Sequence, residues 1–216
     1  MPPTEELVLR NLGYTNGIIY WMFNDCWPAS LGWAFVDYYL RRKPAYYMFR
    51  RLAHDVTGSI DISTKNLIVS NTADEARAAR VTVRFLDLSN ACRELDKVST
   101  SVGLDAYSVI SVDVSDKIKD GVLAVVDVET EGTLYRSYYK SGKLEIQRND
   151  SFEVVARDEN SITIKALSYL QAVEFEGDYN FSDNYFTMLE GEEKTVTFEK
   201  FSDKASGVSI KSYVLK

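Results

Sequence analysis

The sequence predicts a mainly β protein, in which two β-sandwiches follow a helix-strand-helix segment of the kind that ends a (β/α)8 barrel. Three observations lead to this prediction. All tryptophans and prolines of the 216-residue chain lie within its first 44 residues, the net charge changes from +2 over residues 1–54 to −9 over the remainder, and apolar residues alternate with period two from there on. A joint change in residue type, charge and periodicity indicates a boundary between structural units.

The N-terminal segment, residues 1–54, has the pattern of one piece of an α/β barrel. Thr4 is a suitable N-cap for a short helix predicted over 4–13. The continuous apolar run 17–23 predicts a strand buried on both faces, although the pattern alone leaves a buried helix open. A second helix is predicted over 44–52, because proline suits its first turn and aromatic residues recur at helical spacing.

Two sets of short alternating segments follow this N-terminal segment. The first set is 59–63, 67–70, 80–85, 109–114 and 123–128, and the second is 152–155, 161–165, 172–175, 194–198 and 208–214. Each set is close in size to one small immunoglobulin-like domain. We therefore predict one immunoglobulin-like β-sandwich over residues 55–141 and a second over residues 142–216.

Composition excludes several classes of function. A net charge of −7 argues against a nucleic-acid groove or an anionic membrane surface as partner, and no apolar run approaches the ~20 residues that cross a bilayer. His54 is the only histidine, and Cys26 and Cys92 are the only cysteines, so neither a metal centre nor a cofactor is predicted. The first residues lack the basic and apolar stretches of a signal peptide, which leaves the location open and favours the cytoplasm.

The densest group of candidate binding residues is Trp21, Asn24, Asp25 and Trp27. If the predicted strand ends just before Asn24, these side chains lie at its C-terminal mouth, where barrel enzymes bind their ligands. An indole face with neighbouring amide and carboxylate groups suits a sugar, whose C–H face stacks on the ring and whose hydroxyls need directed partners. The alternative is that both indoles are core residues and Asn24-Asp25 is a turn.

Two stretches of this sequence resemble a known family. Residues 17–30, with 33–40 and 43–47, resemble the last strand and helix of the barrel in β-mannosidases of glycoside hydrolase family 2. Residues 181–186 and 189–196 are similar to the C-terminal immunoglobulin-like domain of the same enzymes. The order of barrel end, sandwich and sandwich is also theirs, so the resemblance covers essentially the whole chain. It implies that Trp21 is a stacking platform for a terminal β-mannoside.

The resemblance also implies what this chain lacks. The family hydrolyses with retention through two carboxylates about 5–5.5 Å apart. In relatives the acid/base follows an asparagine, and both glutamates precede the segment matched here. This sequence contains no Asn-Glu pair, and Glu5 and Glu6 suit the positive end of a helix dipole better than catalysis. The expectation is that this chain is the C-terminal fragment, or a truncated reading frame, of an exo-acting enzyme. The chain itself is expected to contain no catalytic residue and to be inactive.

A second hypothesis is a stand-alone, non-catalytic module that binds carbohydrate or serves as structure. A barrel with an Asn-Glu pair encoded upstream would favour the enzyme, whereas an independent gene whose product binds mannosides would favour the module. Exo-β-glucosaminidases share the architecture, so the identity of the sugar stays open. A single barrel strand also exposes unpaired edges, which would offer a surface for self-association.

Overall fold

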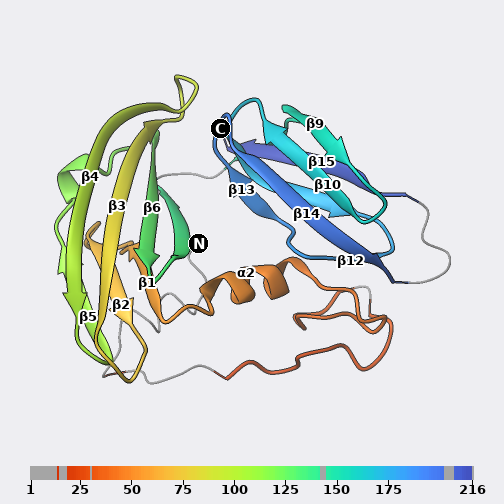
Figure 1. Cartoon of the computed structure of the whole chain (residues 1–216), viewed down its shortest axis with the longest axis horizontal. Helices are drawn as coiled ribbons and strands as arrows, with labels where there is room; N and C mark the ends of the chain where they lie inside the picture. The colour runs from red at the N-terminus through yellow and green to blue at the C-terminus, as the bar shows by residue number, and fades with distance from the viewer. Residues whose placement is uncertain (1–13, 15–18, 30, 142–144, 202–206, 216) are drawn as a thin grey trace. The chain divides into compact units, whose positions relative to one another are not determined.

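The computed structural model describes residues 14, 19–29, 31–141, 145–201 and 207–215 (Figure 1). The chain divides into two compact units. Unit 1 comprises Met1–Ile19 with Phe49–Lys143, and unit 2 comprises Tyr20–Met48 with Leu144–Lys216. Described secondary structure in both units is dominated by antiparallel strands, so the predicted mainly β fold class is confirmed.

Unit 1 is a sandwich of a three-stranded and a four-stranded sheet. The first sheet has the order β1 (Val56–Ile60), β2 (Leu67–Asn71), β5 (Ser108–Val112), and the second has the order β4 (Arg93–Leu104), β3 (Arg77–Asp87), β6 (Val122–Thr130), β7 (Thr133–Lys140). A 3-10 turn, η1 (Ser115–Lys117), precedes β6. Alternation along β3 turns Val81, Val83 and Phe85 inward, where they meet apolar side chains of both sheets.

Gly58 on β1 is required by the close packing of these two sheets. A Cβ atom at this position would lie 2.6 Å from the Cγ2 atom of Val128 on β6. The carbonyl of Gly58 also accepts a hydrogen bond of 2.6 Å from the hydroxyl of Ser137 on β7. Only a residue without a side chain fits here, which explains a glycine inside a strand.

Unit 2 contains a sandwich of two four-stranded sheets. One has the order β12 (Tyr179–Phe181), β14 (Glu193–Lys200), β10 (Ser161–Ala166), β9 (Phe152–Arg157), and the other β13 (Phe186–Met188), β11 (Leu170–Glu176), β15 (Ser209–Leu215), β8 (Ile146–Arg148). Its core is rich in aromatic rings, with Phe175 packed against Phe181 and Phe186 at centroid distances of 5.7 and 6.1 Å.

The helix predicted over 44–52 is confirmed as α2 (Pro44–Leu52), whose residues up to Met48 belong to unit 2. The helix predicted over 4–13 lies outside the described residues. The strand predicted over 17–23 is wrong for its described part, 19–23, which forms no strand and is mostly exposed. Met22 has a φ of 73°, which breaks an extended backbone, and none of the described strands pairs with this segment.

A barrel remnant is therefore not evident in the described residues, although the two sandwiches are. The limits predicted for the three domains stay predictions. The compact units group residues 20–48 with the C-terminal sandwich, which the sequence pattern does not indicate.

Candidate functional site

The candidate residues all lie in Tyr20–Met48, which we call the tryptophan segment. Trp21 is 78% exposed and Trp27 is 65% exposed. Asn24 is also exposed, and its amide donates to the backbone carbonyl of Asp25 at 3.2 Å. The alternative in which both indoles are core residues does not hold, because each presents most of its ring to solvent.

Asp25 differs from the other candidates because it is buried. It is 6% exposed, and its Oδ2 atom lies 2.6 Å from the Nζ atom of Lys43. The same ammonium group donates to the carbonyl of Gly32 at 3.3 Å. A Cβ atom at residue 32 would lie 2.7 Å from Asp25 Oδ1, so the glycine leaves room for the carboxylate. The carboxylate thus joins two parts of the segment.

Backbone hydrogen bonds hold the ends of the loop that carries Trp27. The amide of Asp25 donates to the carbonyl of Val36, and the amide of Val36 donates to the carbonyl of Phe23, both at 3.0 Å. Phe35, the residue before Val36, is buried, and its ring centroid lies 4.5 Å from that of Tyr20. The hydrogen-bonded residues Phe23, Asp25 and Val36 therefore form the base of a loop that carries exposed indoles.

Trp33 lies in the same segment and is 76% exposed. Sequence reasoning assigns it no role in the site, since it is further from the predicted strand end. In the structure its exposure matches that of Trp21. The structure therefore places all three tryptophans of the chain on the surface of one segment.

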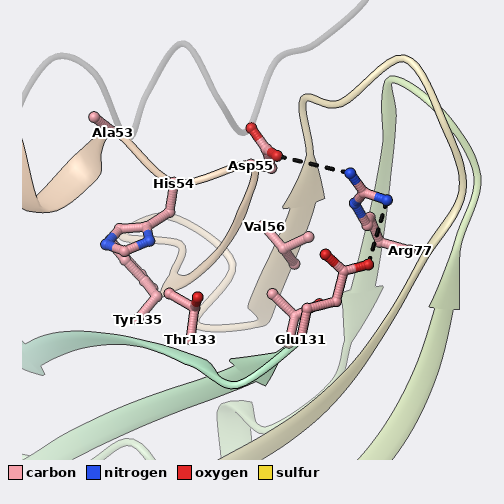
Figure 2. Close-up of a pocket in the computed structure, with 9 residues that line it drawn as sticks. Ala53, His54, Asp55, Val56, Arg77, Glu131, Thr133 and Tyr135 are labelled. Carbon is pink, nitrogen blue, oxygen red and sulfur yellow. Dashed lines mark ion pairs between the residues drawn. The ribbon is translucent and has the colours of Figure 1, made fainter.

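A separate pocket of about 250 Å³ lies in unit 1, lined by His54, Asp55, Arg77, Glu131 and Tyr135 among others (Figure 2). The Arg77 guanidinium pairs with Glu131 at 3.3 Å and Asp55 at 4.0 Å, as the dashed lines in Figure 2 show, and with Glu75 at 2.7 Å. The His54 ring packs edge-on against Tyr135, with centroids 5.7 Å apart.

This pocket has the chemistry of a structural ion-pair cluster. Three carboxylates surround the guanidinium of Arg77, which ties β3 to the turn between β6 and β7. No sequence motif marks the pocket, because its lining is drawn from segments that are far apart in the chain. Among the described residues, no group of three or more histidine, cysteine or acidic side chains could hold a metal ion. In that same part of the chain, no helix has the length and apolarity of a membrane span.

Comparisons with known proteins connect this architecture to one class of enzyme. Residues 143–213 match the family model Ig_mannosidase, an Ig-fold domain. Beta-mannosidase B of Aspergillus terreus is 24% identical over 219 aligned positions, which cover 85% of this chain and 25% of that protein. The chain therefore spans about a quarter of the length of this relative.

Solved structures share the fold. The β-D-mannosidase of Dictyoglomus thermophilum matches 98% of this chain and 28% of its own, with a TM-score of 0.70 and 20% identity. The exo-chitosanase of Amycolatopsis orientalis matches 98% of this chain and 33% of its own, with a TM-score of 0.68 and 17% identity. From its matched Ig-fold domain and these relatives, the chain resembles the C-terminal region of β-mannosidases.

Proposed function

We propose that this chain serves as the C-terminal part of a family 2 glycoside hydrolase that removes terminal β-mannosides with retention. In this proposal the tryptophan segment forms one wall of the sugar site. The observation that carries the proposal is the exposure of Trp21 and Trp27 on either side of Asp25, which is anchored by Lys43. The names of the three relatives reported above, two β-mannosidases and an exo-chitosanase, suggest the class of substrate.

Each candidate residue has a distinct part in the proposed site. The exposed indole of Trp21 offers a flat apolar face on which the C–H face of a pyranose gains dispersion and apolar burial. Trp27 and the exposed amide of Asn24 would line the same wall. Asp25 would act by holding the segment's shape, since its carboxylate is buried against Lys43.

The proposed chemistry needs two carboxylates that this chain does not offer in the family's pattern, since it lacks an Asn-Glu pair. The purified chain is therefore expected not to hydrolyse 4-nitrophenyl β-D-mannoside. Release of nitrophenol is the measurement. Turnover that survives repurification and disappears after a point substitution within this chain would contradict the proposal.

The exposed tryptophans also favour the second candidate function, a non-catalytic module that binds carbohydrate. Titration of the chain with methyl β-D-mannoside, followed by tryptophan fluorescence, distinguishes the two. Because all three tryptophans lie in the tryptophan segment, quenching reports binding at that segment. Tight binding by the isolated chain supports the module. Weak binding together with no hydrolysis fits a wall that works only beside a barrel.

A further inference from the structure

The tryptophan segment and the C-terminal sandwich, both within unit 2, are joined by hydrogen bonds to the backbone carbonyl of Phe181. The Nη1 atom of Arg42 donates to this oxygen at 3.1 Å, and the hydroxyl of Tyr47 lies 3.4 Å from it. Tyr47 is 2% exposed, and its ring lies 6.0 Å from that of Tyr185. One charged and one neutral donor therefore converge on the same acceptor.

The carbonyl of Phe181 belongs to a strand of the sandwich. Its residue ends β12, and its side chain is buried in the core. The next residue, Ser182, forms two hydrogen bonds with Thr197 on β14. The amide of Ser182 donates to the carbonyl of Thr197 at 2.8 Å, and the amide of Thr197 donates to the hydroxyl of Ser182 at 2.9 Å. The acceptor is thus held by the strand pairing of the sandwich, independently of its contacts with the tryptophan segment.

A short chain of contacts leads from this carbonyl to the exposed indoles. Arg42 forms an antiparallel bridge with Val36, whose backbone in turn bonds to Asp25. The next residue, Lys43, donates its amide to the carbonyl of Phe35 at 2.9 Å and its ammonium to Asp25 at 2.6 Å. Every link from Arg42 to the base of the loop that carries Trp27 is a hydrogen bond or an ion pair.

We propose that Arg42 and Tyr47 are positioning residues, which hold the tryptophan segment in place by fastening it to the Phe181 carbonyl of the C-terminal sandwich. The sandwich thereby sets the geometry of the sugar wall. The sugar part of this inference rests on the proposed function, whereas the mechanical part rests on the contacts alone. Burial raises the pKa of the Tyr47 phenol, which keeps its hydroxyl protonated as a donor.

The test uses the full chain with Arg42→Ala, Arg42→Lys and Tyr47→Phe. Arg41→Ala is the matched control, because Arg41 is adjacent and exposed and pairs with Asp37 instead. Hydrogen exchange of the Asp25 and Val36 amides reports the base of the segment. Loss of one charge-assisted hydrogen bond predicts exchange about tenfold faster in Arg42→Ala. The exchange of amides in the core strands β10 and β11 should not change.

Tryptophan anisotropy supplies a second signal that a purely structural residue elsewhere would not move. It should fall in Arg42→Ala, recover in part in Arg42→Lys, which keeps a cationic donor, and stay unchanged in Arg41→Ala. Tyr47→Phe gives a milder form of the same change and guards against a variant that does not fold. The affinity for methyl β-D-mannoside should weaken about tenfold in Arg42→Ala, in step with the loss of order.

The outcomes separate the two proposals. Wild-type exchange and anisotropy in both Arg42→Ala and Tyr47→Phe would overturn the positioning role. Equal effects of Arg41→Ala and Arg42→Ala would also overturn it, because they would indicate a general charge effect. Loosening in Arg42→Ala with no sugar binding by the wild-type chain would support the positioning role and count against the stand-alone carbohydrate-binding module.

Discussion

Asn184→Ala is expected to destabilise the C-terminal sandwich strongly, because this side chain replaces a missing stretch of strand pairing. Asn184 is 3% exposed. Its Oδ1 atom accepts from the amides of Phe175 at 2.8 Å and Tyr185 at 2.9 Å, and its amide group donates to the carbonyl of Phe175 at 2.8 Å. The pairing of β11 with β13 ends at Val173 and Phe186, so no backbone group replaces these bonds.

The magnitude follows from the groups that the substitution leaves without partners. Each buried donor or acceptor that loses its hydrogen bond costs about 1–3 kcal/mol, and water entering the site recovers part of this. We expect a loss of about 2–4 kcal/mol in the free energy of unfolding. For a unit of this size, 1 kcal/mol corresponds to a shift of about 4–8 °C in Tm, so Tm should fall by roughly 10–25 °C.

Differential scanning calorimetry of the whole chain, with urea unfolding followed by circular dichroism, measures this change. Asn160→Ala is the matched control, because Asn160 is an exposed asparagine in the turn between β9 and β10 of the same sandwich. The control should stay within about 0.5 kcal/mol of the wild type. An Asn184→Ala chain equally close to the wild type would refute the reasoning that this side chain completes the sheet.

The remaining predictions address three other sites. Gly32→Ala should displace the Asp25 carboxylate and cost about 1–3 kcal/mol of local stability, seen as faster hydrogen exchange over residues 23–36; unchanged exchange would contradict the close approach. At Asp61 partial burial raises the pKa, but hydrogen bonds from Ser63 and Thr64 outweigh it and lower the pKa to about 2. The stabilisation from ionised Asp61 should therefore be complete above about pH 4 and be lost as the pH falls towards 2. Asp61→Asn should lower the Tm at pH 7, and its Tm should converge with that of the wild type near pH 2. Parallel Tm curves down to pH 2 would count against this role of Asp61. Finally, sedimentation velocity should show self-association through the exposed indoles that Trp21→Ala weakens, whereas a strict monomer at high concentration would exclude it.

Alternation predicted the strands where one face is buried and the other is not. The segment 161–165 in β10 is an example, since Ile162 and Ile164 are buried in the core of the C-terminal sandwich while their neighbours along the strand face outward. Strand β4 was not predictable in this way, because most of its side chains are exposed and few are apolar. The strands β12 and β13 are too short to show a period.

The error at residues 17–23 has a different cause. An apolar run predicts burial, but burial in a parallel sheet requires neighbouring strands. In the described residues Asn24 and Val36 form only an isolated bridge, so the apolar side chains before them stay exposed. Pattern within one segment cannot supply partners from outside it.

The candidate site was predictable as a list of residues but not as an arrangement. The Asn-Asp and Lys-Pro elements stand 18 positions apart, and only the structure shows that Asp25 and Lys43 form a pair. The contact of Arg42 with Phe181 joins residues 139 positions apart, and a carbonyl acceptor leaves no trace in the sequence. Long-range contacts of this kind depend on packing, not on local pattern.

The most direct test of the proposed function places this chain in an active enzyme. Beta-mannosidase B of Aspergillus terreus, with its matching region replaced by this chain, would be compared with the same chimera carrying Trp21→Ala or, as matched control, Trp33→Ala. Loss of a large aromatic contact costs a few kcal/mol, so kcat/KM for 4-nitrophenyl β-D-mannoside should fall about a hundredfold or more in Trp21→Ala. The Tm of this variant should not change. Trp33→Ala should lower kcat/KM much less. A Trp21→Ala chimera that cleaves at the normal rate while folded would contradict the assignment of this segment to the sugar site.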